Sequence, residues 1–340
     1  MSEIAIIGAG AWGTALSIIL GRTGNHRVRL WVHEKVVCET MKHQRVNENF
    51  LPSQLIPPSV TPYEGLAEAL DGATMLVSAM PSQHCRHLFE QMKPLLSAET
   101  LIVSATKGLE ENSLLRMTEV IAQVIRRDSA QSPRIGALSG PSFALEAARG
   151  DPTAITIASH DPELARTVQR EFSNASFRVY TNEDPIGVEL GGALKNTSAI
   201  AAGVSAGLGL GHNSVAALIT RGLAEMTRLV VACGGKAETM AGLAGLGDLV
   251  LTCTGGLSRN RSVGVELGRG RKLPEILAGM HGMVAEGIFT TTAAVGLAHA
   301  RGVEMPITEQ MQAILHEGKA PREAMNELMT RRGKSETFRI

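Results

Sequence analysis

A glycine-rich segment at the start of the chain constrains the fold more than any other feature. Residues 3–7, Glu-Ile-Ala-Ile-Ile, predict a short buried strand, and residues 14–20 predict a helix; between them lies Gly8-Ala9-Gly10-Ala11-Trp12-Gly13. A dinucleotide-binding turn needs this order, because Gly8 allows the tight turn, Gly10 lets the backbone approach a pyrophosphate and Gly13 lets helix and strand pack closely. The helix N-terminus offers N–H groups and a positive dipole end to the phosphates.

The rest of the first half alternates between strand-like and helical patterns. Apolar, strand-like runs lie at residues 27–32, 74–79, 100–104, 134–138, 153–158 and 177–180. Helical patterns lie between several of them, at residues 83–92, 114–125 and 162–172. Alternation of this kind predicts βαβ units and a parallel sheet.

The pattern changes near residue 182. Helical patterns follow at residues 187–205, 214–233, 284–300 and 307–316, with no convincing alternation of strand type. The sequence therefore predicts an α/β, Rossmann-type dinucleotide-binding domain over residues 1–182. An all-helical domain is expected over residues 183–340, and 340 residues are enough for two such domains.

Composition excludes several classes of function. Lys plus Arg and Asp plus Glu both total 33, so the formal net charge is zero and general nucleic-acid binding is not expected. The four cysteines form no C-x-x-C pair, and His84-x-x-His87 lacks a third ligand, so no metal is expected.

The first residues lack a basic n-region, and the longest uncharged stretch, residues 196–211, is too short to span a bilayer. We expect a cytoplasmic protein without membrane insertion.

Lys195 is the strongest candidate for chemistry. It lies within Gly191-Gly192-Ala193-Leu194-Lys195-Asn196, whose small and apolar flanks predict a buried helix. A buried lysine is costly unless it is paired or used. Burial and nearby cations would lower its pKa towards that of a proton donor or acceptor.

Two further candidates follow predicted strands. Lys107 ends the turn after residues 101–104, and Ser139-Gly140-Pro141-Ser142 follows residues 135–138. Ligands of open parallel sheets bind beyond the carboxyl ends of the strands, so Lys107 is well placed to contact a cofactor or an anionic substrate. Gly140 permits close backbone approach, and Ser142 is also a candidate cap for the next helix.

A third cluster lies in the helical half. Asp248 follows the glycine-rich stretch 242–247, where we expect a turn, and it could orient a lysine or a hydroxyl group. Ser258-Arg259-Asn260-Arg261 opens a predicted helix. Two guanidinium groups, a hydroxyl, an amide and the free N–H groups of a helix start suit a phosphate.

The end of the second predicted strand bears on the choice of cofactor. His33 and Glu34 lie there, and Glu34 is 24 residues after Gly10, close to the usual spacing of an acidic residue that contacts the adenosine ribose. Lys35 follows and would tolerate a 2′-phosphate. The sequence leaves NAD and NADP as alternatives.

Together these segments resemble the bacterial type of NAD(P)-dependent glycerol-3-phosphate dehydrogenase. The matching motifs occur in the family's order over nearly the full chain. They are Gly8-Ala9-Gly10-Ala11-Trp12-Gly13-Thr14-Ala15-Leu16, Ser104-Ala105-Thr106-Lys107-Gly108-Leu109-Glu110, Leu138-Ser139-Gly140-Pro141-Ser142-Phe143-Ala144, Gly192-Ala193-Leu194-Lys195-Asn196, Gly242-Leu243-Ala244-Gly245-Leu246-Gly247-Asp248-Leu249, Thr252-Cys253-Thr254 and Ser258-Arg259-Asn260.

The resemblance implies reversible reduction of dihydroxyacetone phosphate to sn-glycerol 3-phosphate for phospholipid synthesis, and a homodimer. Lys195 matches the catalytic lysine, which also binds substrate. The other substrate positions are Lys107, Gly140, Ser142, Asp248, Ser258, Arg259 and Asn260. The NAD(P)H positions are Gly8, Gly10, Ala11, Trp12, Gly13, His33, Lys107, Ala144, Arg259, Val284 and Glu286. Many relatives carry serine where this chain has Ala11, so a side-chain hydrogen bond to phosphate is absent here.

Two other functions fit parts of the pattern. Other hydroxy-acid and keto-acid dehydrogenases share the two-domain plan, and Arg259 could bind their substrate carboxylate. A nicotinamide-sensing regulatory module would keep the glycine fingerprint, but it would not need Lys107, Lys195 and Asp248 in these settings.

Overall fold

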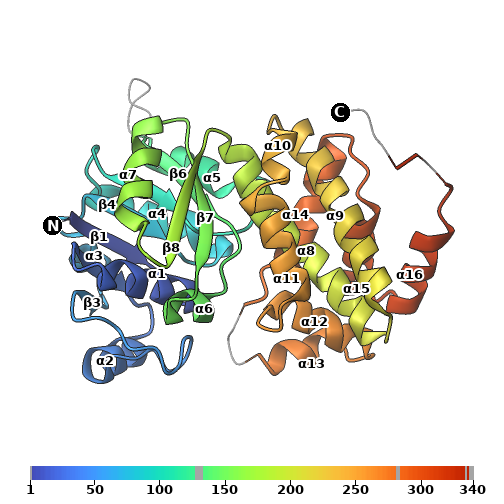
Figure 1. Ribbon diagram of the computed structural model, residues 1–340, viewed down its shortest axis with the longest axis horizontal. Coiled ribbons are helices and arrows are strands. Elements are labelled where there is room, and N and C mark those ends of the chain that lie inside the picture. Colours follow the sequence, from blue (N-terminus) through green and yellow to red (C-terminus); the bar gives the residue numbers. More distant parts are fainter. Residues whose placement is uncertain (1, 127–132, 281–283, 334, 337–340) are drawn as a thin grey trace. The chain divides into compact units, whose positions relative to one another are not determined.

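The computed structural model describes residues 2–126, 133–280, 284–333 and 335–336. It divides the chain into two compact units (Figure 1). The first comprises residues 1–107 and 116–185, and the second comprises residues 108–115 and 186–340. The second unit thus includes a short segment from the first half of the sequence. The functional limits expected above, 1–182 and 183–340, stay a prediction.

The first unit is built on an eight-stranded sheet in the order β3-β2-β1-β4-β5-β6-β7-β8. The strands are β1 (Ser2–Ile7), β2 (His26–Trp31), β3 (Val60–Tyr63), β4 (Met75–Ser78), β5 (Leu101–Ser104), β6 (Ile135–Ser139), β7 (Thr153–Ala158) and β8 (Phe177–Asn182). Strand β1 lies between β2 and β4, and residues 4–7 are completely buried, as expected for the strand predicted over residues 3–7. The Rossmann-type sheet is confirmed.

Two features of the sheet differ from the sequence-based expectation. Strands β6 and β7 pair antiparallel, with Leu138 opposite Ile157, so the sheet is not parallel throughout. Strand β3 was not expected, because Val60-Thr61-Pro62-Tyr63 is short and contains a proline. Pro62 has no N–H for a ladder, and the structure places it at the edge of the sheet, where this defect is tolerated.

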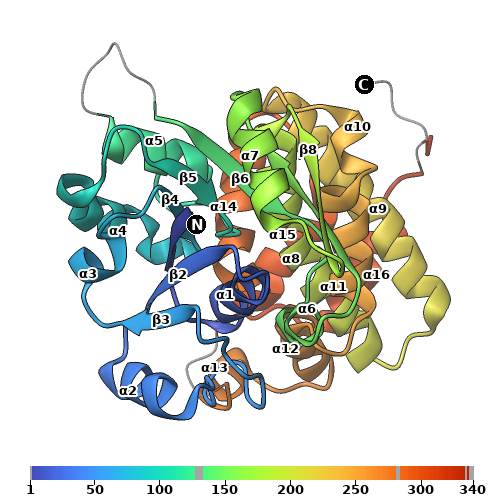
Figure 2. The ribbon, with the colours of Figure 1, turned by 60° about the vertical axis from the view of Figure 1, so that its left-hand side comes forward.

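Helices cover both faces of this sheet (Figure 2). Helices α1, α6 and α7 pack together on one face, and α4 and α5 pack together on the other. The helices of this unit are α1 (Ala11–Arg22), α2 (Lys35–Gln44), α3 (Leu66–Leu70), α4 (Cys85–Met92), α5 (Met117–Ile125), α6 (Ala144–Arg149) and α7 (Pro162–Phe172), with 3₁₀ turns η1 (Ser82–His84) and η2 (Lys93–Leu95). Helix α5 begins at Met117 rather than 114, because Leu114 has a positive φ of 59° and cannot continue a helix.

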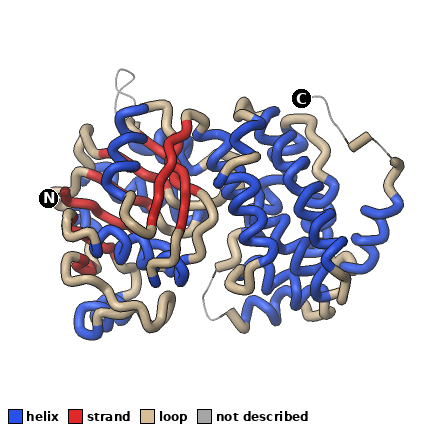
Figure 3. The backbone as a smooth tube through the Cα atoms, viewed as in Figure 1, coloured by secondary structure: helices blue, strands red, loops and turns tan. Residues whose placement is uncertain are grey.

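The second unit contains helices and loops but no strand among its described residues (Figure 3). The expected all-helical half is confirmed. Its helices are α8 (Pro185–Gly207), α9 (His212–Ala232), α10 (Ala237–Met240), α11 (Asp248–Thr254), α12 (Arg259–Gly268), α13 (Leu273–Ala278), α14 (Gly287–Ala300), α15 (Pro306–His316) and α16 (Pro321–Thr330). A π-helical turn, η3 (Leu243–Gly247), leads into α11 at the place where a glycine-rich turn is expected.

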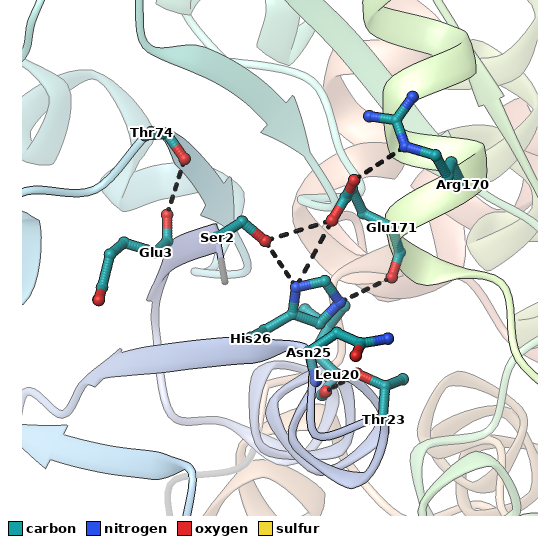
Figure 4. Close-up of polar contacts among 9 residues, drawn as sticks. All are labelled: Ser2, Glu3, Leu20, Thr23, Asn25, His26, Thr74, Arg170 and Glu171. Carbon is teal, nitrogen blue, oxygen red and sulfur yellow. Dashed lines mark hydrogen bonds and ion pairs between the residues drawn. The ribbon is translucent and has the colours of Figure 1, made fainter.

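A partly buried polar cluster links the first strands to α7 (Figure 4). His26 Nδ1 lies 2.7 Å from Ser2 Oγ, and His26 Nε2 lies 3.0 Å from the main-chain oxygen of Glu171. The Ser2 hydroxyl also donates to Glu171 Oε2 at 3.2 Å. Serine, histidine and glutamate thus meet at the amino ends of β1 and β2. Ligands of such sheets bind at the carboxyl ends, so we interpret this cluster as a structural link.

The described residues were also considered as a membrane span and as a metal site, and neither is formed by a single helix or by a cluster of ligands. No single helix in the described ranges is long and apolar enough to cross a membrane, although the bent pair Ala237–Thr254 and Arg259–Gly268 passes the same criteria of length and composition. No group of three or more His, Cys, Asp or Glu side chains in those ranges is arranged to hold a metal ion.

Candidate active site

The glycine fingerprint forms the turn between β1 and α1. Gly8 has a φ of +114°, and a Cβ atom there would lie 2.8 Å from the carbonyl oxygen of Ala79. A Cβ atom on Gly13 would lie 1.9 Å from the carbonyl oxygen of Gly8, so helix and turn touch directly. A Cβ atom on Gly10, in contrast, would meet no atom within 4 Å. The turn is therefore closed on its protein side and open beside Gly10.

Helix α1 presents an uncapped N-terminus at this open position. Its N-cap residue is Gly10, which has no side chain that could cap the helix. The first-turn residues Ala11 and Trp12 are half-buried, and the buried indole Nε1 of Trp12 has no hydrogen-bond partner within the described part of the chain. An uncapped, uncrowded helix start suits a phosphate.

The two strand-end candidates of the first unit converge on one carbonyl group. Lys107 Nζ donates to the Gly140 carbonyl oxygen at 3.2 Å, and the Ser142 hydroxyl donates to the same oxygen at 2.9 Å. Gly140 has a φ of +141°, and a Cβ atom there would lie 2.9 Å from Ile155 Cα. The prediction that Ser142 caps the next helix is wrong: the N-cap of α6 is Phe143, and the Ser142 hydroxyl turns back to Gly140 instead.

The remaining first-unit candidates lie at other strand and helix ends. Ala144 is the first residue of α6. His33 follows β2 and is exposed, with its ring 5.6 Å from the ring of Trp31. Glu34 is the N-cap residue of α2, but its side chain makes no capping hydrogen bond. The side chains of His33 and Glu34 thus lie beside the start of α2, where Glu34 makes no capping hydrogen bond.

Lys195 lies in α8 with 7 % of its surface exposed, so it is buried, as its small and apolar flanks predict. Its ammonium group donates to Asp248 Oδ1 at 2.5 Å and to Thr252 Oγ1 at 2.7 Å. Asp248 is 1 % exposed. The carboxylate of Asp248 is thus a charged partner of Lys195. A buried charge needs such a partner, because removal from water is otherwise too costly.

Asp248 and Thr252 share one face of α11. The Thr252 hydroxyl accepts from Lys195 and donates to the main-chain oxygen of Asp248 at 2.6 Å. The spacing of four residues places the two side chains one above the other on the helix. Lys195, Asp248 and Thr252, which we call the lysine cluster, thus fix the ammonium group from two directions.

The start of α12 carries the expected phosphate cluster. Ser258 is its N-cap and accepts from the N–H of Arg261 at 3.2 Å, which confirms a helix start here. Asn260 Nδ2 donates to Asn196 Oδ1 at 3.0 Å, and Asn260 Oδ1 accepts from the N–H of Gly287 at 3.0 Å. Asn260 is buried, whereas Arg259 is exposed. Of the two guanidinium groups expected to bind a phosphate, that of Arg259 belongs to an exposed residue and that of Arg261 to a half-buried one.

The last two candidates lie next to this link. Glu286 is the N-cap residue of α14, and Val284 precedes it by two positions. Because Asn260 binds Gly287, the start of α14 is attached to the start of α12. Asn196 follows Lys195 directly in α8, so the same hydrogen bonds place the lysine near both helix starts.

Sequence reasoning missed two residues of the second unit. The motif Thr252-Cys253-Thr254 does not by itself assign a role to Thr252, but its position four residues after Asp248 is a signal that the two share a helix face. Asn196 follows Lys195, and the sequence gives it no role because it does not show that α8 and α12 meet.

Two family matches cover most of the chain. Residues 3–165 match the N-terminus of NAD-dependent glycerol-3-phosphate dehydrogenase, and residues 184–326 match its C-terminus. The chain belongs to this family. A protein of Koribacter versatilis named glycerol-3-phosphate dehydrogenase [NAD(P)+] is 64 % identical over 338 residues, which cover 99 % of this chain and 100 % of the relative.

Other glycerol-3-phosphate dehydrogenases agree with this assignment. The protein of the same name from Acidobacterium capsulatum is 55 % identical over 99 % of this chain and 100 % of the relative. A crystal structure of glycerol-3-phosphate dehydrogenase from Coxiella burnetii matches with a TM-score of 0.92 at 43 % identity, covering 97 % of this chain and 99 % of that one. The family resemblance stated from the motifs is confirmed.

Proposed function

We propose that this chain catalyses the reversible, NAD(P)H-dependent reduction of dihydroxyacetone phosphate to sn-glycerol 3-phosphate, and so supplies glycerophospholipid synthesis. The observation that carries the proposal is the lysine cluster, a buried ammonium group held by Asp248 and Thr252. The names of the relatives, glycerol-3-phosphate dehydrogenase [NAD(P)+], support it.

The glycine fingerprint fits a dinucleotide. Space beside Gly10 and the uncapped start of α1 suit a pyrophosphate, whereas a side chain at Gly8 or Gly13 would collide with backbone. When bound, NAD(P)H supplies the hydride. We assign its binding to Gly8, Gly10, Ala11, Trp12, Gly13, His33, Lys107 and Ala144 of the first unit, and to Arg259, Val284 and Glu286 of the second.

Within this proposal, Lys195 moves the proton. Its ammonium group donates to the carbonyl oxygen of the substrate as that oxygen gains negative charge, and in the reverse direction the neutral amine accepts the proton. Asp248 and Thr252 hold the nitrogen in place, so its position does not have to be found during the reaction.

The other substrate residues bind and orient. Arg259 extends from the start of α12 and supplies a guanidinium group for the phosphate, with Ser258 and Asn260 shaping that helix start. Lys107, Gly140 and Ser142 are the proposed substrate residues of the first unit. Binding energy from the phosphate, which does not react, then serves to position the ketone.

An absorbance assay tests the proposal against its alternatives. We expect NADH or NADPH oxidation with dihydroxyacetone phosphate and little with keto acids, and the two cofactors, assayed separately, will show the preference. Oxidation with keto acids alone would favour the hydroxy-acid dehydrogenase alternative. Cofactor binding without turnover of any of these ketones would favour a sensing module.

The variant Lys195→Met tests the proton donor. We expect turnover to fall by about two to four orders of magnitude, the usual contribution of general acid–base catalysis, while NADH binding changes little. The variant also leaves Asp248 buried without its cation, which costs stability, so retained NADH binding serves as the check of folding. Normal turnover would refute the assigned role.

We also propose a homodimer in the cytoplasm, with residues 1–182 binding the cofactor and residues 183–340 carrying the catalytic lysine. Family resemblance is the support for the dimer. Sedimentation equilibrium of the purified protein, with a mass of 36.0 kDa for one chain, measures it directly.

A further inference from the structure

We propose that Asn47, which lies outside the glycine fingerprint, is a positioning residue for the pyrophosphate of the cofactor. It turns the carbonyl group of Ala9 into the protein interior, so that the N–H groups at the start of α1 face the phosphates without an opposing oxygen. The inference rests on the dinucleotide binding proposed above and names a residue that its fingerprint does not include.

The contacts of Asn47 converge on the turn between β1 and α1. Its Nδ2 donates to the Ala9 carbonyl oxygen at 2.8 Å and to Thr14 Oγ1 at 2.8 Å. The Thr14 hydroxyl in turn donates to the same Ala9 oxygen at 3.2 Å. Asn47 and Thr14 are both 0 % exposed. Because both donors are completely buried, the carbonyl group that they bind points inward.

The direction of this carbonyl group matters for an anion. The turn has one peptide oxygen at Ala9, beside the N–H groups that begin α1 at Gly10 and Ala11. A carbonyl oxygen directed towards the phosphates would oppose the positive end of the helix dipole, whereas one bound inside the protein leaves that end unopposed. Two donors on one oxygen also satisfy its hydrogen-bonding capacity, which a buried carbonyl group requires.

The chemistry of an asparagine side chain fits this position. Both amide protons are used, on Ala9 and Thr14, and Oδ1 accepts from the N–H of Phe50 at 3.3 Å. An ionised aspartate has no proton to donate, and its charge would repel both the Ala9 oxygen and a phosphate. Asn47 is therefore neutral, fully hydrogen-bonded and suited to a site that binds an anion nearby.

The segment that carries Asn47 is itself fixed. It connects α2 to β3, and the N–H of Leu51 donates to the main-chain oxygen of Asn47 at 2.9 Å. At its start, Arg45 has a φ of +58° and donates from its guanidinium group to the main-chain oxygens of Ile56 and Pro57. A locked loop presents Asn47 to the fingerprint before any ligand arrives, so the turn is preorganised.

Binding of ADP-ribose to the purified full chain tests the proposal, because ADP-ribose carries the pyrophosphate without the reactive ring. In Asn47→Ala, we expect calorimetry to show a dissociation constant about tenfold higher, since the buried Ala9 carbonyl group loses one of its two donors and is held less firmly. Adenosine, which has no phosphate, should bind as it does to the unchanged chain. The KM for dihydroxyacetone phosphate at saturating NADH should also stay unchanged.

Two sets of variants separate positioning from general loss of structure. Thr14→Val removes the second donor and should weaken ADP-ribose binding by a smaller factor, whereas Thr14→Ser should restore it. Asn174→Ala is the matched control, because Asn174 accepts from the N–H groups of Ser176 and Phe177 in the same unit, far along the chain from the fingerprint. This control should bind ADP-ribose normally. If Asn47→Ala does not fold, the Thr14 pair decides by the same criterion.

Two results would overturn the proposal. One is unchanged ADP-ribose affinity in folded Asn47→Ala, and the other is an equal loss of affinity for ADP-ribose and for adenosine in that variant. The outcome is independent of the proposed reaction: if the unchanged chain binds ADP-ribose but does not reduce dihydroxyacetone phosphate, the reaction is wrong and the Asn47 test still stands. If the unchanged chain binds neither ADP-ribose nor NADH, dinucleotide binding and this inference both fail.

Discussion

Thr252 illustrates how one hydroxyl group fixes a charged side chain. The ammonium group of Lys195 has three protons and donates one of them to Asp248. Thr252 supplies a second acceptor 2.7 Å away, and its own proton is directed to the main-chain oxygen of Asp248. Its hydroxyl is therefore oriented as an acceptor for the lysine by the helix that carries it.

The neighbouring residue, Cys253, does not ionise near neutral pH. Burial raises the pKa of the Cys253 thiol to about 12, so this cysteine stays protonated at neutral pH.

Replacement of Thr252 by valine keeps the shape and removes the hydroxyl group. We expect kcat to fall by about ten- to hundredfold, because a hydrogen bond to a charged group is lost and the nitrogen is less well placed. NADH binding should not change. Steady-state kinetics of the purified variant measures both.

Thr254→Val is the matched control in the same helix. The Thr254 hydroxyl donates to the main-chain oxygen of Val250 at 2.8 Å, in the same i to i−4 pattern, but it is exposed and outside the lysine cluster. Its kcat should remain normal. Equal losses in the two variants would show that the effect comes from the helix and not from the contact with Lys195.

At the scale of elements, glycine contacts join the helix that carries Lys195 to the helix that carries Arg259. A Cβ atom on Gly203 of α8 would lie 2.1 Å from the main-chain oxygen of Arg261 in α12, and one on Gly207 would lie 2.2 Å from that of Val265. The reciprocal glycines of α12, Gly264 and Gly268, are equally close to the backbone of α8. The two backbones therefore touch without intervening side chains, and this contact sets the distance between the lysine cluster and the proposed phosphate site.

Gly203→Ala should push α8 and α12 apart. We expect a loss of roughly 1–3 kcal/mol in stability, as for other overpacked positions, together with a higher KM for dihydroxyacetone phosphate. Gly256→Ala in the same unit should change neither quantity, because a Cβ atom there would meet nothing within 4 Å. Urea denaturation and steady-state kinetics measure the two effects. An unchanged KM in Gly203→Ala would show that the helix contact does not set the substrate site.

At the scale of the whole molecule, a buried carboxyl group links stability to pH. Glu225 of α9 is 3 % exposed and accepts from the N–H groups of Ile307 and Thr308 at the start of α15. Burial raises the pKa of Glu225 from 4.5 to about 7, against the opposing effect of these hydrogen bonds and of Arg228. Between these two values the folded protein binds more protons than the unfolded chain, so this group's contribution to stability falls as pH rises.

Glu225→Gln should remove that dependence, because glutamine stays neutral. Relative to the variant, the wild-type protein should lose stability from about pH 4.5 to about pH 7, by at most roughly 1.4 kcal/mol per pH unit, and the difference should be constant above this window. Urea midpoints of both proteins across the range measure it, and the other titrating groups cancel in the comparison. Parallel curves for the two proteins would contradict the prediction.

The sequence by itself determined the class of fold and the residue types of the site. Its periodicities located most strands and helices, and residues 153–158 and 162–172 coincide with β7 and α7. The glycine fingerprint predicted the cofactor site, because a tight turn against a phosphate requires glycine at given positions. The single lysine in an apolar helix predicted the proton donor, because a charge is costly to bury unless it is paired or used.

The tertiary structure alone decided which distant residues meet. Strand β3, the antiparallel pairing of β7, the lysine cluster and the link from Asn47 to Ala9 all join segments separated by many residues. Pairing and side-chain hydrogen bonds of this kind depend on the packing of whole elements, and a pattern of nearby residues does not contain them. Local motifs therefore indicate which residues can react or bind. Only the packing of the elements determines which neighbours hold those side chains in position.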